Sequence, residues 1–278
     1  MSTHRFHQLD VFADRPLAGN PLAVVHDAAA LSEAQMAAFA RWTNLSETTF
    51  LLPPTDAQAD YRVRIFTPGG ELPFAGHPTL GSCHAWLAAG GAPKSHDRIV
   101  QQCAVGLVPL RRDGSKLAFA APPCLREPVD PALLQAVLAA LGLAAERVQA
   151  AAWLDNGPRW LSLRIDDAAT LLALTPDHAA LRSLAKVGLV APQPAGADTA
   201  FEVRAFAAPV GINEDPVTGS LNAGLAQWLI DDGAAPDAYV AAQGTALGRA
   251  GRVHVLREGD ALWIGGEVTP CIEGELRL

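Results

Sequence analysis

Long apolar segments and runs of basic residues are both absent from this sequence. No stretch approaches the roughly 20 apolar residues that span a bilayer, and segment 1–7 lacks the apolar core of a signal peptide. The 21 basic and 29 acidic residues give a net charge of −8, which disfavours binding to the phosphate backbone of a nucleic acid. We therefore expect a cytoplasmic protein with neither a membrane nor a nucleic-acid partner.

Cysteine is scarce and widely scattered. The four residues Cys83, Cys103, Cys124 and Cys271 lack the paired close spacing of a zinc site or a redox dithiol. Free thiols in a reducing compartment, with no metal, are the expectation. Half of the residues are apolar and only 18% are charged, a composition typical of a folded chain.

Predicted strands outnumber predicted helices, which favours an α+β class. Short runs rich in β-branched and aromatic residues predict strands over 61–66, 160–165, 201–206 and 253–256. A Ser32/Gln35 capping box begins one helix, and Asp130-Pro131 begins a second that ends near Gly142. A third helix is predicted from Thr175-Pro176 to Gly188.

A local pattern occurs twice and predicts an internal duplication. In the first copy, Arg64-Ile65-Phe66 is followed by Gly76-His77-Pro78-Thr79 and an apolar helix. Arg204-Ala205-Phe206, then Asp215-Pro216-Val217-Thr218-Gly219-Ser220 and a second apolar helix, follow about 140 residues later. Four prolines between 121 and 134 suggest a linker, so the chain is expected to divide near residue 120.

Each repeated loop is predicted to begin a buried helix. The unpaired N–H groups and positive dipole of a helix start bind anions, and glycine allows close approach. Pro78 and Pro216 are expected in the first helical turn, with the hydroxyls of Thr79, Thr218 and Ser220 as extra donors. A carboxylate is the expected ligand; ordinary capped helix starts are the alternative.

Two further segments carry candidate polar groups. Glu47 lies between a predicted helix end and an apolar strand start, where a carboxylate could serve as a general base. A surface or capping glutamate is the alternative. The segment Gly19-Asn20-Pro21 is either a turn or a loop that offers the Asn20 amide to a substrate.

Taken together, these segments resemble the phenazine-biosynthesis isomerase-like family of the diaminopimelate epimerase fold superfamily. The resemblance runs nearly end to end. Its motifs are His7-Gln8-Leu9-Asp10-Val11-Phe12, Gly19-Asn20-Pro21-Leu22-Ala23-Val24, Asn44-Leu45-Ser46-Glu47-Thr48, Phe66-Thr67-Pro68, Gly76-His77-Pro78-Thr79, Glu214-Asp215-Pro216-Val217-Thr218-Gly219-Ser220 and Gln243-Gly244.

The resemblance implies two similar α+β domains, each a barrel-like mixed sheet around a central helix, with the active site in the interdomain cleft. The N-terminal half is expected over 1–120 with the C-terminal strand 265–278, and the C-terminal half over 121–264. By similarity, Glu47, His77 and Asp215 are catalytic. The implied substrate-binding residues are Asn20, Ser46, Gly76, Thr79, Gly219 and Ser220.

The implied activity is a cofactor-independent proton transfer, with a double-bond shift, on a small cyclic or amino carboxylic acid. Glu47 would be the acid/base, and neither a metal nor an organic cofactor is implied. An amino-acid epimerase or racemase and a non-catalytic binding protein are the alternatives. Two-thiol racemisation is disfavoured because neither loop carries a cysteine. Relatives of this type often pair, so a homodimer is also expected.

Overall fold

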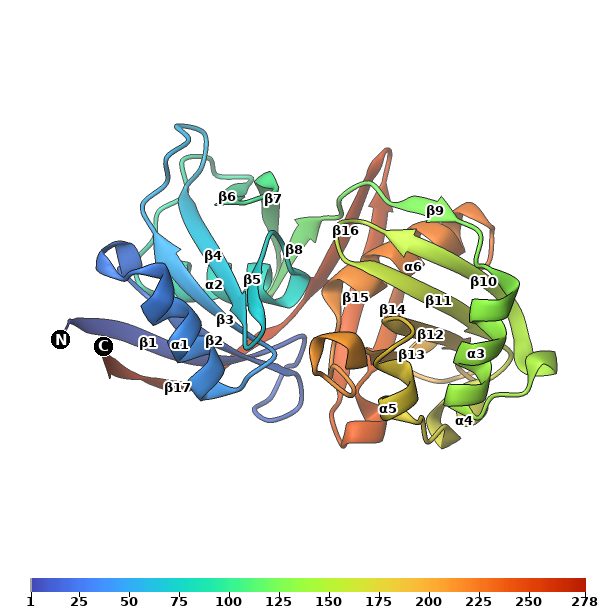
Figure 1. Cartoon of the computed structure of the whole chain (residues 1–278). Helices are drawn as coiled ribbons and strands as arrows, with labels where there is room; N and C mark the ends of the chain where they lie inside the picture. Colours follow the sequence, from blue (N-terminus) through green and yellow to red (C-terminus); the bar gives the residue numbers. More distant parts are fainter. Residues whose placement is uncertain (1) are drawn as a thin grey trace. The chain divides into compact units, whose positions relative to one another are not determined.

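The computed structural model describes residues 2–278, and these form two compact units. Within the described residues, unit 1 comprises 2–120 and 265–278, and unit 2 comprises 121–264. Each unit has its own series of paired strands of mixed direction and its own long central helix, so the α+β class is confirmed (Figure 1). Within residues 2–278, no helix is long and apolar enough to cross a membrane.

The unit 1 sheet pairs strands from both ends of the chain. In pairing order its strands are β17 (Val268–Arg277), β1 (Thr3–Val11), β2 (Asn20–Val25), β3 (Glu47–Leu52), β4 (Tyr61–Thr67), β6 (Ile99–Cys103), β7 (Gly106–Asp113) and β8 (Lys116–Ala120). The short β5 (Gly70–Leu72) also pairs with β4. The pairs β2–β3 and β4–β6 are parallel, and the others are antiparallel.

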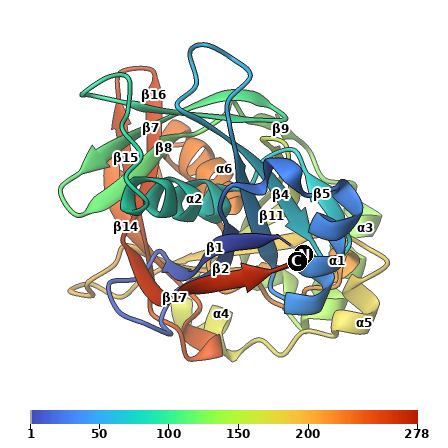
Figure 2. The same ribbon diagram turned by 90° about the vertical axis from the view of Figure 1, so that its left-hand side faces the viewer.

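Helix α2 (Gly76–Ala88) is the central helix of unit 1 (Figure 2). It contacts β17 and β8, the first and last strands of the series given above, so the strands of unit 1 curl around it. Gly81 allows this approach, because a Cβ there would lie 2.5 Å from the Leu22 side chain. The amphipathic α1 (Glu33–Thr43) follows the 3-10 turn η1 (Ala28–Ala30) and begins with the predicted Ser32/Gln35 capping box.

The unit 2 sheet repeats this pattern. Its strands are β9 (Leu125–Glu127), β10 (Val148–Asp155), β11 (Arg159–Ile165), β12 (Val187–Pro192), β13 (Phe201–Phe206), β14 (Ala238–Gln243), β15 (Gly251–Glu258) and β16 (Ala261–Gly266). The pairs β11–β12 and β13–β14 are parallel, whereas β9–β10, β10–β11, β12–β13 and β14–β15 are antiparallel. This is the order of directions from β17 to β7 in unit 1, which supports an internal duplication.

Helix α6 (Gly219–Asp231) corresponds in unit 2 to α2 in unit 1. Each of these helices lies in the connection that joins the two strands of a parallel pair along the chain. Gly188 leaves room for it, because a Cβ there would lie 2.2 Å from Leu221. The other helices are α3 (Pro131–Leu141), α4 (Ala168–Ala173) and α5 (His178–Leu181), with 3-10 turns η2 (Ala145–Arg147), η3 (Ala208–Val210) and η4 (Thr245–Leu247).

Most predicted elements are confirmed, and one helix is wrong. The four strands appear as β4, β11, β13 and β15, and α3 begins after Asp130 and ends at Gly142. The predicted helix from Thr175 to Gly188 contains only the four-residue α5, and strand β12 begins at Val187. The apolar residues after Lys186 are buried because they belong to a central strand, which a helical reading of the same residues misses.

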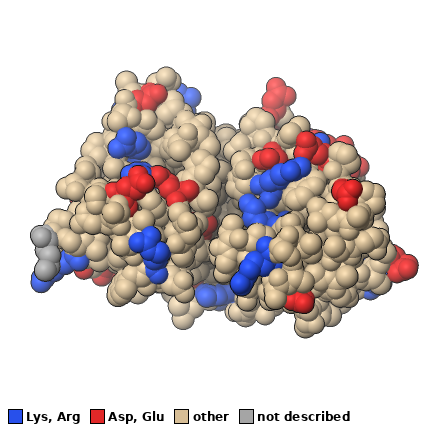
Figure 3. All heavy atoms as spheres, viewed as in Figure 1, with Lys and Arg blue, Asp and Glu red and all other residues tan. Residues whose placement is uncertain are grey.

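Charged side chains of both signs occur on the face of the molecule that Figure 3 views. Figure 3 shows Lys and Arg interspersed with Asp and Glu on the face that it views. Arg64, for example, pairs with both Glu33 and Glu71. Exposed pairs of this kind contribute about 0–1 kcal/mol each. The stability of each unit therefore rests mainly on its apolar core.

Candidate active site

Three elements of unit 1 begin at the same place. Asn20 is the first residue of β2, Glu47 the first of β3 and Gly76 the first of α2. Because β2 and β3 are parallel and adjacent, their starts share one edge of the sheet, with Leu22 opposite Glu47. The fold therefore gathers residues that are up to 57 positions apart in sequence.

The gathered side chains form a linear polar series. The Ser46 hydroxyl donates to Asn20 Oδ1 over 3.3 Å, and Asn20 Nδ2 lies 3.3 Å from His77 Nδ1. His77 Nε2 in turn lies 3.5 Å from Glu47 Oε2. Asn20 and His77 are buried, and the Glu47 side chain is 12% exposed. Four of the predicted site residues are thus adjacent in the structure.

His77 is a neutral imidazole. Burial removes it from water and lowers its pKa to about 3, so it carries no charge at neutral pH. Asn20 Nδ2 can only donate, so Nδ1 of His77 is the acceptor and the ring proton lies on Nε2. That proton is on the nitrogen nearest Glu47. Within residues 2–278, His77 Nε2 has no hydrogen-bond partner, which leaves it available to a ligand.

The start of α2 carries no side-chain cap. The backbone N–H groups of Gly76 and His77 therefore belong to an uncapped helix terminus, as an anion site requires. Thr79, a predicted substrate-binding residue, already has hydrogen-bond partners within unit 1. It is fully buried, and its hydroxyl donates to Ala75 O over 2.9 Å while accepting a hydrogen bond from Gln101. A substrate contact by this hydroxyl would require the bond to Ala75 to break.

In unit 2, the loop before α6 holds Asp215 in a buried position. The Thr218 hydroxyl donates to Asp215 Oδ2 over 2.6 Å, and Asp215 N donates to Ala205 O. The Thr218 hydroxyl is thus used inside the loop, whereas we expected it as a donor to substrate. The expectation for Pro216 is also wrong: α6 begins at Gly219 with Thr218 as its N-cap residue, so Pro216 precedes the helix.

Gly219 and Ser220 form the first turn of α6, which also has no side-chain cap. Both are buried, and Ser220 Oγ accepts a hydrogen bond from Trp160 Nε1 at 3.3 Å. The Ser220 hydroxyl proton is not used in that bond. Each unit therefore presents an uncapped helix start beside a buried carboxylate or imidazole.

Two buried features of unit 2 were missed from the sequence. Gln243 binds both Asp215 O and Thr218, and Arg204 forms an ion pair with Glu214 at 2.8 Å. Arg204 and Glu214 are only 6% and 8% exposed, and Arg204 also donates to Leu171 O and Leu174 O. The only sequence signal for Gln243 was its place in the Gln243-Gly244 motif.

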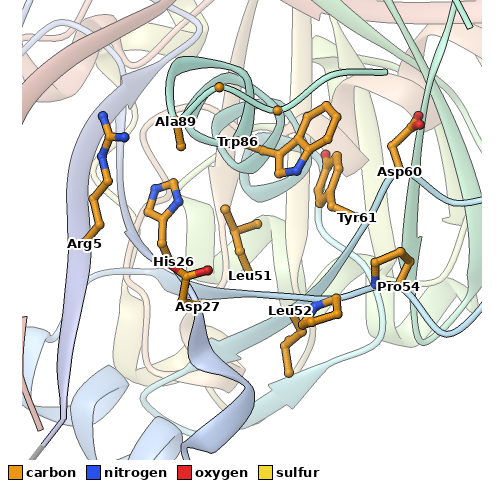
Figure 4. Close-up of a pocket in the computed structure, with 13 residues that line it drawn as sticks. Arg5, His26, Asp27, Leu51, Leu52, Pro54, Asp60, Tyr61, Trp86 and Ala89 are labelled. Carbon is orange, nitrogen blue, oxygen red and sulfur yellow. The ribbon is translucent and has the colours of Figure 1, made fainter. Parts of the chain in front are cut away.

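A cavity of about 400 Å³ lies elsewhere in unit 1 (Figure 4). Its lining includes Arg5, His26, Leu52, Tyr61 and Trp86, and it shares no residue with the polar series. Leu52 ends β3 and Trp86 lies about 14 Å along α2 from His77, so the cavity is at the opposite ends of these elements. It is not the site that the sequence motifs form.

The thiols and the possible metal ligands add no second centre. Cys83 is fully buried on α2, and burial raises its pKa to about 12, which leaves it an unreactive thiol. Among residues 2–278, no three His, Cys, Asp or Glu side chains gather closely enough to hold a metal ion. The chemistry available at the helix starts is therefore that of carboxylates, an imidazole and backbone N–H groups.

A profile of the phenazine biosynthesis-like proteins matches residues 9–274. The chain belongs to this family. It is 37% identical over 292 residues to trans-2,3-dihydro-3-hydroxyanthranilate isomerase of Pseudomonas aeruginosa, with 99% of this chain and 100% of that protein covered. It is 36% identical to antisense-enhancing sequence 1 of Schizosaccharomyces pombe, with 99% of each chain covered.

Among solved structures, a predicted epimerase from Pseudomonas aeruginosa superposes with a TM-score of 0.83. It is 32% identical in sequence, and the match covers 98% of this chain and 99% of that one. The epimerase-like fold expected from the sequence is therefore confirmed. Relatives named as isomerases match this chain over nearly their full length. This member of the phenazine biosynthesis-like family is therefore an isomerase.

Proposed function

We propose that this isomerase transfers a proton between carbons of trans-2,3-dihydro-3-hydroxyanthranilate or a closely related cyclic amino acid, with Glu47 as the acid/base. The observation that supports this most strongly is the contact between Glu47 and His77. A carboxylate that is 12% exposed lies 3.5 Å from the Nε2–H of a neutral imidazole. A general base needs such a fixed and largely desolvated position.

The reaction uses one side chain for both proton steps. Glu47 accepts a proton from a ring carbon, and the electrons of that C–H bond form a new C=C bond. The electrons of the existing C=C bond then take the proton back from Glu47 at another carbon, which returns Glu47 to its ionised form. Atoms and electrons balance within the substrate, so the transfer needs no cofactor.

Neutral His77 suits this cycle better than a charged imidazolium would. A permanent positive charge 3.5 Å from Glu47 would stabilise its carboxylate and oppose proton uptake. The Nε2–H group is a dipole that favours the carboxylate only modestly. It can also donate to charge that develops on the substrate, which is the larger contribution in most proton transfers. Asn20 and Ser46 hold the ring in this tautomer.

The substrate carboxylate is assigned to the helix starts. Gly76 at α2 and Gly219 at α6 begin uncapped helices of 13 residues each, and a glycine at that position allows an anion to reach the backbone. Asp215 and Ser220 would contact the amino or hydroxyl groups of the substrate. A small carboxylate-bearing ring is the class of substrate that such groups suit.

The test is to incubate the protein with trans-2,3-dihydro-3-hydroxyanthranilate in D2O and to locate the deuterium by NMR. We expect deuterium at a carbon that was unsaturated in the substrate, together with a shifted double bond. Deuterium at a stereocentre with inversion and no double-bond shift would indicate an epimerase instead. Incorporation nowhere in this substrate or its cyclic relatives would reject the proposal.

A further inference from the structure

Gln243 is the last residue of β14 and is almost fully buried. Its amide makes four hydrogen bonds, all to the loop before α6 or to the first turn of α6. Nε2 donates to Asp215 O at 3.1 Å and to Thr218 Oγ1 at 2.9 Å. Oε1 accepts from Thr218 N at 2.9 Å and from Asn222 Nδ2 at 2.8 Å. One side chain therefore connects strand β14 to the whole catalytic loop of unit 2.

The backbone fixes the orientation of this amide. Asp215 O can only accept a hydrogen bond and Thr218 N can only donate one, so Nε2 must face the former and Oε1 the latter. Asn222 agrees with this assignment, because its Nδ2 also donates to Thr218 O. A flipped amide would oppose donor to donor and acceptor to acceptor at buried positions, at a cost of about 1–3 kcal/mol for each unmade bond.

The fixed amide determines the direction of the next hydrogen bond. Thr218 Oγ1 receives a proton from Gln243 Nε2, so its own single proton must be donated elsewhere. The acceptor is Asp215 Oδ2, at 2.6 Å. The hydrogen bonds are thus donated in one direction, from Gln243 to Thr218 and from Thr218 to Asp215, so that Oδ2 is an acceptor.

We propose that Thr218 and Gln243 are positioning residues for Asp215, which fix its carboxyl rotamer by committing Oδ2 to the Thr218 hydroxyl. This inference rests on the proposed role of Asp215 and specifies how that role is achieved. A hydrogen bond to a carboxylate is about twice as strong as one between neutral groups, so the hydroxyl of Thr218 favours the ionised form of Asp215, which accepts hydrogen bonds from an amino or hydroxyl group. The motif residues Asp215 and Thr218 are then explained as a pair, with Gln243 as their support.

The first test compares Thr218→Val, which keeps the shape but removes the hydroxyl, with Thr218→Ser, which keeps the hydroxyl. We expect Thr218→Val to lower kcat for deuterium exchange by about 10- to 100-fold, as misplaced catalytic groups do, with a smaller change in KM. Thr218→Ser should keep kcat within about threefold of the wild-type value, because the proposed role needs the hydroxyl and not the methyl group. Equal losses in both variants would overturn the inference.

A double-mutant cycle with Asp215→Asn separates this inference from the proposed function. If Thr218 acts through Asp215, Thr218→Val should add no more than about a twofold loss in the Asp215→Asn background. Multiplicative losses, or a wild-type rate for Thr218→Val beside an impaired Asp215→Asn, would overturn the inference and leave the proposed function standing. A wild-type rate for Asp215→Asn would reject the role of Asp215, and the inference with it.

Gln243→Glu hardly changes the size of the side chain, and it tests the direction of the hydrogen bonds from Gln243 to Thr218 and from Thr218 to Asp215. The new carboxylate oxygen would accept the Thr218 hydroxyl proton, which would then no longer be donated to Asp215. We expect a loss of kcat similar to that of Thr218→Val. Gln227→Glu is the matched control, because Gln227 lies on α6 but hydrogen-bonds Pro122 O and Cys124 N instead of the Asp215 loop. An unchanged kcat in Gln243→Glu would overturn the inference.

Discussion

Replacing His77 with glutamine should make the folded protein less sensitive to acid. Burial lowers the pKa of His77 from 6.5 to about 3 in the folded state. The folded protein therefore binds fewer protons than the unfolded chain between these two values, and its stability falls as the pH falls through that window. Removal of the imidazole removes this pH-dependent part of the unfolding free energy. Any loss of packing in the variant lowers its stability at both pH values and does not affect the difference between them.

The size of the effect follows from the two pKa values. A pH of 5 lies about 1.5 units below the pKa of the imidazole in the unfolded chain, so that imidazole is almost fully protonated. In the folded protein the imidazole remains neutral at this pH. At 1.36 kcal/mol per unit, His77 should account for about 2 kcal/mol of the stability lost between pH 8 and pH 5. Buried His26, with a pKa lowered to about 4 by burial, contributes similarly in wild type and variant and cancels.

The assay is urea unfolding at pH 8 and pH 5, followed by tryptophan fluorescence. The fall in unfolding free energy between the two pH values should be smaller in His77→Gln than in wild type by about 2 kcal/mol. His96→Gln is the matched control: this side chain is fully exposed, so its loss should leave the pH dependence as in wild type. Equal falls in wild type and His77→Gln would refute a neutral buried His77.

Three further predictions concern stability and reactivity. Iodoacetamide at pH 8 should modify exposed Cys271 and leave buried Cys83 intact with full activity; rapid alkylation of Cys83, read by mass spectrometry, would contradict its raised pKa. Arg204→Met leaves Glu214 without its buried partner and should lower the unfolding free energy by about 3–5 kcal/mol; a change near zero would show that the ion pair is dispensable. Gly19→Ala, next in sequence to Asn20, places a Cβ 2.2 Å from the backbone carbonyl oxygen of Val11. The variant should lose about 1–3 kcal/mol of stability in thermal unfolding and should also lose activity. A wild-type melting temperature and rate would contradict this.

The polar series of unit 1 could be predicted from motifs, but its geometry could not. Asn20, Glu47 and His77 are each ordinary residues at an element start, and only the parallel pairing of β2 with β3 brings two of them to one edge. The tautomer of His77 follows from the orientation of the Asn20 amide. That orientation depends on contacts that are distant in sequence and that no local pattern encodes.

The hydroxyls show what could not be read from the sequence. Thr79 and Thr218 both lie at helix starts, where a hydroxyl is a plausible donor to an anion. In the structure, Thr79 donates to Ala75 O and Thr218 donates to Asp215. A hydroxyl has one proton, so the nearest strong acceptor decides its use, and that acceptor is visible only after folding. Gln243 was missed for the same reason.

The central claim is that Glu47 moves the proton, and Glu47→Gln tests it most directly. The measurement is deuterium wash-in from D2O into trans-2,3-dihydro-3-hydroxyanthranilate, by wild type and variant, with binding of 3-hydroxyanthranilate measured by calorimetry as the control for an intact site. The account predicts retained binding and a loss of exchange by about 10²- to 10⁴-fold, the usual contribution of a general acid/base. Exchange at the wild-type rate in Glu47→Gln would contradict it.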